Sequence, residues 1–223
     1  MPKPRETKGE RTRQRIRAAA LHSFRENGYD ATTIRAIADE LGLSVGVTNY
    51  HFASKNHLVQ ELYLDVQEAH RAAADPQLAG ETRLIERLRI VYSAGLDQLE
   101  PYHAHAGEFL SAAVSPRSPL NPLSAESAPA MAITLGLFTE AVEGAAASGV
   151  PDDIRRLLPR ALVVSYLLLA LFWVYDPSDD RRRTRRLLDR GLKLLGGVLP
   201  LARLPLLRGT LRDLLSLVDE VRT

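Results

Sequence analysis

The sequence predicts an all-α protein, and three observations lead to this class. No segment shows the sustained period-two alternation of a half-buried strand, whereas apolar residues recur at helical spacing nearly end to end. The interruptions fall at residues that typically begin or end helices. The chain has 223 residues, enough to bury a sizeable core as one large domain or two small ones. It has no cysteine, which excludes disulfides, thiolate nucleophiles and cysteine-based zinc sites.

The N-terminal third carries the clearest helix signals. A first helix should begin at Thr7, where "TKGE" has the pattern of a capping box, and should end at Asn27-Gly28. A second helix should begin at Thr33, whose hydroxyl can cap it. It should end at Gly42, which would supply the positive φ that a sharp turn between helices needs.

The remaining helices follow from caps and breakers. Ser44 should cap a short third helix, and Ser54 a longer fourth helix that ends before Pro76. Residues 115–124 form a proline-rich loop, and a last helix should begin at Thr210, with Asp213 completing its cap. The other helices are expected at about 81–99, 102–114, 125–148, 152–175 and 179–195.

Positive charge is concentrated near the N-terminus. Residues 1–60 hold ten Lys/Arg against six Asp/Glu, a net of +4, so the rest of the chain, with 19 against 21, carries −2. This distribution is typical of a basic domain that binds a polyanion, and a solvated charged helix face explains it equally well. No apolar segment follows the basic N-terminus, so it does not have the pattern of a secretory signal.

Residues 34–51 have the pattern of a helix-turn-helix unit. Ala38, four residues before Gly42, is small enough for two helices to approach closely. The helix after Ser44 is short and contains poor helix formers, so it would not be stable alone. We therefore expect the neighbouring segments to hold this helix in place, so that its exposed groups can contact the major groove of DNA.

Each residue of this unit has an expected role. Val45 and Val47 could touch a thymine methyl, and Thr48 or Asn49 could bond to base edges. Gly46 would let the backbone approach DNA closely. Phosphate contacts are expected from Tyr50, His51 and Lys55, and from the helix starts capped by Thr33 and Ser44, although these two residues could be caps and nothing more.

The segment "TTIRAIADELGLSVGVTNYHFASKNHLVQEL" resembles the DNA-binding segment of the TetR (tetracycline-repressor-like) family. The resemblance covers roughly residues 10–65. Thr48-Asn49 departs from it, because the family usually has there an apolar core anchor followed by a phosphate-binding tyrosine; Tyr50 is an alternative for that tyrosine. The matching positions are Thr33, Ile37, Ala38, Gly42, Ser44, Gly46, His51, Phe52, Ser54, Lys55 and Leu58.

The resemblance implies a domain organisation and a function. Residues 1–53, ordered from about residue 7, would be the DNA-binding domain. Residues 54–223 would bind an effector and dimerise through the helices at 152–175 and 179–195, with the fourth helix as connector. It implies a cytoplasmic homodimeric regulator that needs no cofactor. The regulator would most readily be a repressor, which a small, largely apolar effector releases from a palindromic double-stranded DNA operator.

Aromatic residues in the C-terminal part are candidates for an effector cavity, and core packing explains them at least as well. They are Tyr92, Tyr102, His103, Phe109, Tyr166 and Trp173. His105 and Glu108 could offer two ligands to a metal ion, which is too few for a site, so no metal is expected.

Two further segments have plain structural interpretations. The apolar run at 161–174 is 14 residues long, shorter than a membrane span, so a core or subunit interface is expected and no membrane. "DDRRRTRRLLDR" at 179–190 is more readily a solvated helix face, with Asp179 and Asp180 at its positive end, than a second nucleic-acid patch.

The sequence offers little support for catalysis. It has no nucleophile elbow, phosphate loop or paired metal motif. Two alternatives to a DNA-binding regulator remain at this stage: an all-helical enzyme, and an interaction protein whose basic N-terminal helix binds acidic partners other than DNA.

Overall fold

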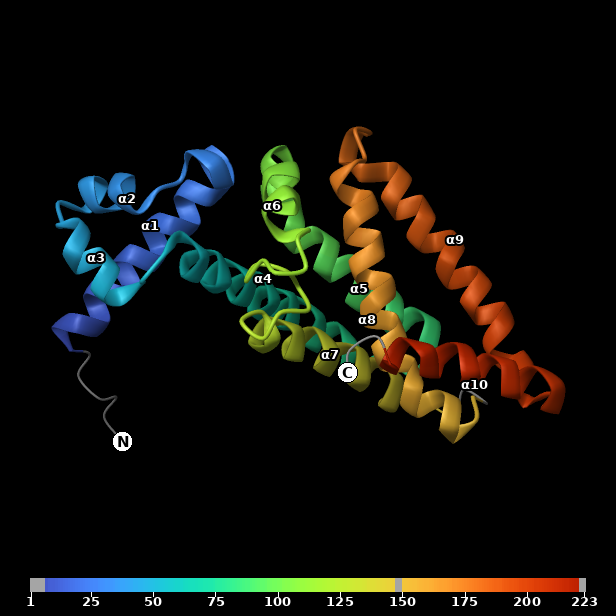
Figure 1. Ribbon diagram of the computed structural model, residues 1–223. Helices are drawn as coiled ribbons and strands as arrows, with labels where there is room; N and C mark the ends of the chain where they lie inside the picture. Colours follow the sequence, from blue (N-terminus) through green and yellow to red (C-terminus); the bar gives the residue numbers. More distant parts are fainter. Residues whose placement is uncertain (1–6, 147–149, 221–223) are drawn as a thin grey trace. The chain divides into compact units, whose positions relative to one another are not determined.

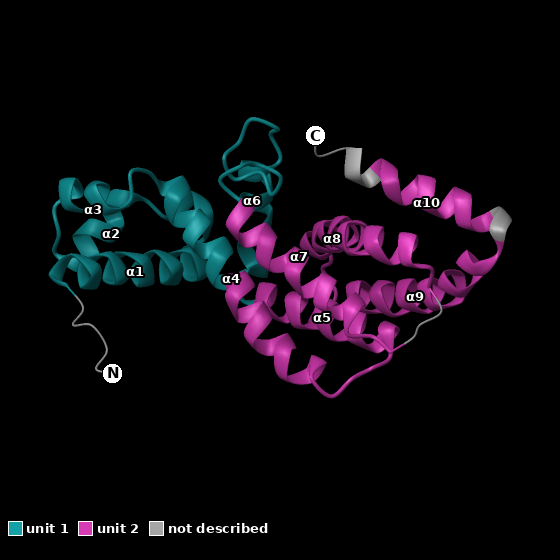
Figure 2. Ribbon diagram, turned by 90° about the horizontal axis from the view of Figure 1, so that it is seen from below, with its two compact units in different colours: residues 1–65, 101–127 teal, residues 66–100, 128–223 magenta. Residues whose placement is uncertain are grey.

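The computed structural model describes residues 7–146 and 150–220, and within these ranges the chain forms α-helices and short 3-10 helices but no strand (Figure 1). The all-α prediction is confirmed. The chain divides into two compact units (Figure 2). The first contains residues 1–65 and 101–127, and the second contains 66–100 and 128–223. Residues 101–127, expected in the C-terminal domain, therefore group with the N-terminal helices.

The first unit begins with α1 (Lys8–Ala31), α2 (Ile34–Leu41) and α3 (Val45–His51). The predicted capping box is present: the Glu10 N–H donates to Thr7 Oγ1 at 3.2 Å, and the Thr7 N–H donates to the Glu10 carboxylate at 2.6 Å. Regular helix geometry stops at Gly28, where the sequence predicted the end: Gly28 takes φ 81° and ψ −176°, so α1 consists of two helical segments joined by a kink there.

The first unit has its own aromatic and aliphatic core. A short 3-10 helix (Glu100–His105) leads into α6 (Ala106–Ala113), which packs against α1. The Phe109 ring lies 5.8 Å from both the Phe24 and the Tyr29 rings, edge-on to each. Residues 114–127 contain no helix, as expected for the proline-rich loop.

α4 (Lys55–Leu78) contributes residues to both units and passes through Pro76, where the sequence predicted its end. A proline in the last turn removes one helix hydrogen bond, and packing can outweigh this loss. Here Ala74 and Leu78 are buried. The Arg87 guanidinium also donates to the C-terminal end of the helix, to the carbonyl of Leu78 at 2.6 Å.

The second unit is a helical assembly built around α8 (Asp152–Val174). α7 (Ala128–Glu143) and α10 (Pro205–Glu220) pack against α8, and α5 (Leu84–Leu99) packs against α7 and α9 (Arg182–Val198). α10 begins at Pro205, earlier than the expected Thr210, because proline fits the first turn of a helix. The expected end of the 125–148 helix lies outside the described residues.

α8 is long and apolar enough, with a mean hydropathy of 2.0, to pass a length-and-composition test for a membrane span, a test that core helices also pass. Six of its large side chains are buried in the second unit: Ile154, Leu158, Leu162, Tyr166, Leu169 and Trp173. The packing agrees with the expected core role, and the absence of a membrane remains a prediction.

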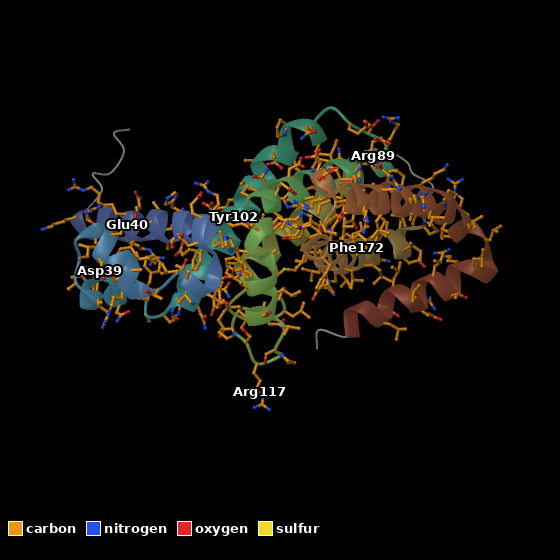
Figure 3. The ribbon with its side chains drawn as sticks, turned by 90° about the horizontal axis from the view of Figure 1, so that it is seen from above. Asp39, Glu40, Arg89, Tyr102, Arg117 and Phe172 are labelled. Carbon is orange, nitrogen blue, oxygen red and sulfur yellow. The ribbon has the colours of Figure 1, made fainter. Side chains whose placement is uncertain are left out.

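The arginine-rich segment before and within α9 makes ion pairs inside the second unit. Arg185 pairs with Asp97 at 2.8 Å, and Arg89 lies where α5 meets α9 (Figure 3) and pairs with Asp189. Arg182, Arg183, Arg186 and Arg190 are exposed, which agrees with the expected solvated helix face. Asp179 and Asp180 lie in a 3-10 turn (Asp179–Arg181) directly before α9, as expected at its positive end. Asp176, which was not expected there, accepts the N–H of Thr184 in the first turn of α9.

Asp176 is a buried carboxylate with four donors. It accepts the N–H and hydroxyl of Ser178 at 3.0 and 2.6 Å, and those of Thr184 at 2.8 and 2.7 Å. Burial alone would raise its pKa, but these hydrogen bonds outweigh burial and hold the pKa well below its usual range. Asp176 therefore fixes the turn between α8 and α9.

Candidate nucleic-acid interface

The turn between α2 and α3 has the geometry that the sequence predicted. Gly42 takes φ 64°, and its N–H points at the carbonyls of Ala38 and Asp39. The Leu43 N–H donates to the Ala38 carbonyl at 2.9 Å. A Cβ at Gly42 would meet no atom within 4 Å, so the left-handed conformation, and not lack of space, requires glycine there.

Side chains cap the N-termini of both helices of this unit. Thr33 Oγ1 accepts the Ala36 N–H at 3.1 Å, and Ser44 Oγ accepts the Val47 N–H at 3.2 Å. Thr33 and Ser44 therefore act as helix caps, which is one of the two roles that the sequence allowed for them. Both residues are also exposed, so their hydroxyl hydrogens can still be donated to a phosphate.

Thr48 is the one residue of α3 that is buried. Its exposure is 0 %, and its hydroxyl has only a long contact of 3.4 Å to the Ser44 carbonyl. The expectation that Thr48 bonds to a base edge is therefore wrong, because its side chain packs inward. Thr48 occupies the place where the TetR pattern has an apolar anchor.

The other residues of α3 form its outward surface. Tyr50 is 86 % exposed and Val47 41 % exposed. Val45, Gly46 and Asn49 are exposed as well, and His51 is half-buried with its ring 5.2 Å from that of Tyr50. Apolar, amide and phenol groups therefore point away from the core on a helix too weak to stand alone.

Lys55, at the first position of α4, is already engaged. Its Nζ donates to the Tyr29 carbonyl at 2.8 Å and lies 3.8 Å from the centre of the Tyr29 ring. Burial lowers its pKa, and the nearby carboxylates of Asp30 and Glu108 act in the opposite direction. Lys55 holds the end of α1 against the start of α4, so a phosphate contact would require it to leave this carbonyl.

The positive charge available to DNA is smaller than the sequence count suggests. Arg13 pairs with Glu61, and Arg17 pairs with Glu61 at 3.1 Å and with Asp65 at 2.7 Å. Arg35 differs, because it is exposed on the first turn of α2 and has no ion pair within the described ranges. Arg35 was not among the residues expected from the sequence, although its place two residues after the Thr33 cap was a usable signal.

Acidic residues limit how α2 can meet DNA. Asp39 and Glu40 are exposed on the second half of the helix (Figure 3). A phosphate would be repelled there and attracted to the first turn, where the helix dipole is positive and Arg35 lies. The favourable approach therefore runs through the start of α2 and along α3.

The six aromatic candidates for an effector cavity are distributed over both units. Tyr92, Tyr166 and Trp173 are buried in the second unit, whereas Tyr102, His103 and Phe109 belong to the first. The Tyr92 and Tyr166 rings lie 6.2 Å apart. Tyr92 bonds to Ser165 and to the Leu162 carbonyl, and burial raises its pKa to about 12.

Polar neighbours of Tyr166 were not expected from the sequence. His70 is buried, its ring lies 5.7 Å from that of Tyr166, and its Nε2 lies 2.7 Å from the Val91 carbonyl. Burial lowers the His70 pKa, which favours the neutral ring. Its Nδ1 lies 3.1 Å from Gln67 Oε1, which also accepts the Thr134 hydroxyl at 2.9 Å. The other side chains of this network are a phenol, an amide and a hydroxyl.

His105 and Glu108 meet, but as part of the packing of α1 against α6. His105 Nδ1 lies 2.9 Å from Glu108, whose second oxygen accepts the Asp30 N–H at 2.8 Å. That bond lowers the Glu108 pKa. Both residues lie against Gly28, where a Cβ would come within 2.5 Å of them. In the part of the chain that the structure describes, no group of three metal-ligating side chains occurs.

A capped, outward-facing helix held by a tight helix–helix turn, joined to a second helical unit, defines the helix-turn-helix class of DNA-binding regulators. Residues 16–62 match the family model described as bacterial regulatory proteins, tetR family. Residues 87–218, more than half of the chain, match the model described as tetracyclin repressor-like, C-terminal domain. The chain belongs to the TetR family of transcriptional regulators.

Curated relatives match over part of the chain. The chain is 36 % identical over 87 residues to the HTH-type transcriptional repressor KstR2 of Mycobacterium tuberculosis, a match that covers 39 % of this chain and 42 % of the relative. It is 38 % identical over 63 residues to the HTH-type transcriptional regulator UidR of Escherichia coli, which covers 28 % and 32 % respectively. The matched segments of the chain thus cover less than half the length of these relatives.

Solved structures match over nearly their whole length. A TetR transcriptional regulator from Nitrosomonas europaea has a TM-score of 0.58 at 20 % identity, covering 82 % of this chain and 97 % of that one. The fatty acid degradation regulator FadR from Bacillus halodurans has a TM-score of 0.58 at 18 % identity, covering 88 % and 97 %. At these identities the likeness establishes the fold.

Proposed function

We propose that this TetR-family regulator is a dimeric, sequence-specific repressor that reads a palindromic operator with α3 and leaves it when a small effector binds. The observation that carries the proposal is the division of α3, with Thr48 buried and Val45, Val47, Asn49 and Tyr50 turned outward. Capped helix starts at Thr33 and Ser44 supply phosphate contacts, and Arg35 adds a cation beside the first of them.

Exposed apolar rows on α8 and α9 support the dimer. Leu168, 61 % exposed, follows Val164 and precedes Phe172 at four-residue steps along one face of α8 (Figure 3 labels Phe172). Leu187, Leu194 and Val198 form a second row on α9, with Leu194 70 % exposed. Leu188 and Leu192, on the same helix, are buried and form a separate face. Such apolar rows typically mark an interface, here with a second copy.

The core around Tyr92 and Tyr166 supports an effector with a largely apolar body and no charge. Its polar groups are phenols, an amide, a hydroxyl and a neutral imidazole, so a buried ion would lack a counter-charge there. An effector that separates helices in this core would favour a conformer with a different spacing of the two α3 helices. Loss of operator binding is the outcome proposed.

Selection of bound sequences from random duplexes tests the proposal. The purified full chain should enrich a palindrome whose half-sites lie about one helical turn, roughly 34 Å, apart. Its preference over unrelated duplexes should persist as salt rises. An interaction protein that binds acidic partners generally would enrich no sequence and lose all duplexes alike with salt. Turnover that survives removal of the first 60 residues would instead revive the enzyme alternative.

A further inference from the structure

The guanidinium of Arg13, on α1, reaches the end of α3 and the side of α4 at once. Its Nη1 donates to the carbonyl of His51, the last residue of α3, at 3.1 Å. Its Nη2 pairs with Glu61. Its Cζ lies 4.3 Å from the centre of the buried Phe52 ring. One side chain of α1 therefore contacts the end of α3 and the side of α4, 38 and 48 residues further along the chain.

These contacts complete the support of a weak helix. α3 has seven residues, and its last carbonyls have no partner within the helix. A cation is favourable there, because the C-terminal end of a helix carries partial negative charge. Ser44 caps the first turn, and Arg13 satisfies the His51 carbonyl at the opposite end.

The surrounding acids hold Arg13 in this place. The Glu61 side chain is only 18 % exposed and also accepts from Arg17, which in turn pairs with Asp65. Glu61 therefore compensates the charge of Arg13 and fixes the guanidinium plane with a directed hydrogen bond. The Arg13 side chain is 47 % exposed, so what keeps its guanidinium from a phosphate is this ion pair and its bond to the His51 carbonyl, not burial.

We propose that Arg13 is a positioning residue, which sets the orientation of α3 for base reading and does not itself neutralise a phosphate. The inference rests on the proposed DNA binding. Composition alone would instead assign phosphate binding to a basic residue in a basic N-terminal helix. A fixed α3 is what base reading needs, because its contacts require defined distances and angles, whereas phosphate attraction tolerates movement.

The test compares Arg13→Lys and Arg13→Gln with the matched control Arg35→Gln in the full-length protein. Affinities for a selected operator and for a shuffled duplex are measured over a range of salt concentrations. Arg13→Lys keeps the positive charge but loses the planar guanidinium that bonds to His51 and Glu61 at once. The ratio of operator affinity to shuffled-duplex affinity should therefore fall about tenfold, while the dependence of affinity on salt concentration stays unchanged. Arg35→Gln removes one phosphate contact from each subunit of the proposed dimer, so it should lower both affinities together and reduce the slope of the salt dependence by about 1.8.

Hydrogen exchange supplies a second readout. The Phe52 amide donates to the Thr48 carbonyl at 2.9 Å, so it reports the last turn of α3. It should exchange faster in Arg13→Lys, while amides in the buried part of α1 keep their wild-type rates.

Each outcome decides the inference. An unchanged affinity ratio in Arg13→Lys, or a salt slope that falls by about 1.8 in the Arg13→Gln dimer, would overturn the positioning role while the proposed function stands. A wild-type protein without any sequence preference would overturn both. If Arg13→Gln does not fold, Arg13→Lys still carries the test through the affinity ratio and the Phe52 exchange rate.

Discussion

Gly46→Ala separates what α3 needs to fold from what it needs to bind. A Cβ at Gly46 would meet only Ser44 Oγ, at 3.8 Å, which is an ordinary contact. Alanine is favoured over glycine in a helix by up to about 1 kcal/mol. The substitution should therefore leave the fold intact and raise the free energy of unfolding by several tenths of a kcal/mol. If the Gly46 backbone approaches DNA closely, the same methyl group should lower operator affinity about tenfold or more, roughly 1.4 kcal/mol.

The two effects need separate assays on the same preparations. Urea unfolding at fixed protein concentration gives the stability, and fluorescence anisotropy with the selected operator gives the affinity. A matched control is Gly9→Ala on the exposed start of α1, where a Cβ would meet only Thr7 Oγ1 at 3.9 Å and no DNA contact is proposed. Wild-type operator affinity in a stabilised Gly46→Ala protein would refute the close approach of α3 to DNA.

Three further changes test other parts of the structure. Thr48→Val should keep the rank order of operator variants and preserve or slightly raise stability, because the lost hydroxyl has only a 3.4 Å contact; a new base preference in binding assays would contradict its burial. Asp176→Ala should lower the free energy of unfolding by about 3–5 kcal/mol in urea titrations, with little change for the exposed Asp179→Ala. Because the folded-state pKa of Asp176 is lowered, its contribution is complete above the unfolded-state pKa and is lost as the pH falls toward the folded-state value, so the deficit of Asp176→Ala should shrink in acid. Leu194→Asp should convert a dimer to monomers in analytical ultracentrifugation while α-helical circular dichroism is retained, and a persistent dimer would place the interface elsewhere.

The local signals of the helix-turn-helix unit were readable from the sequence because each depends on neighbouring residues. The capping box at Thr7, the caps at Thr33 and Ser44, and the positive φ at Gly42 involve atoms at most a few residues apart. The expected helix end at Pro76 was wrong, since Arg87 and buried Leu78 support that turn from outside the local sequence. Helix boundaries that adjacent residues determine were therefore predicted more accurately than boundaries that tertiary contacts determine.

The roles of individual polar residues depended on tertiary contacts that the sequence does not display. Thr48 has a hydroxyl that could bond to a base edge, but the rotation of α3 about its axis places this side chain in the core. Lys55 and Arg13 have the charge of phosphate ligands, yet they bind the carbonyls of Tyr29 and His51. Asp176 caps α9 across a turn in which Asp180 takes φ 50°, a conformation that no local pattern indicated.

These contacts imply that base preference is not encoded in α3 alone. A helix of seven residues with poor propensity takes its orientation from the segments that hold its two ends. The first end is local, at Ser44, whereas the second end depends on α1 through Arg13 and on α4 through Glu61. Substitutions at Arg13 or Glu61, which lie outside α3, should therefore change which sequences are bound. A transplant of the seven residues of α3 into another regulator should carry the operator preference only if the arginine and the acid are moved with it.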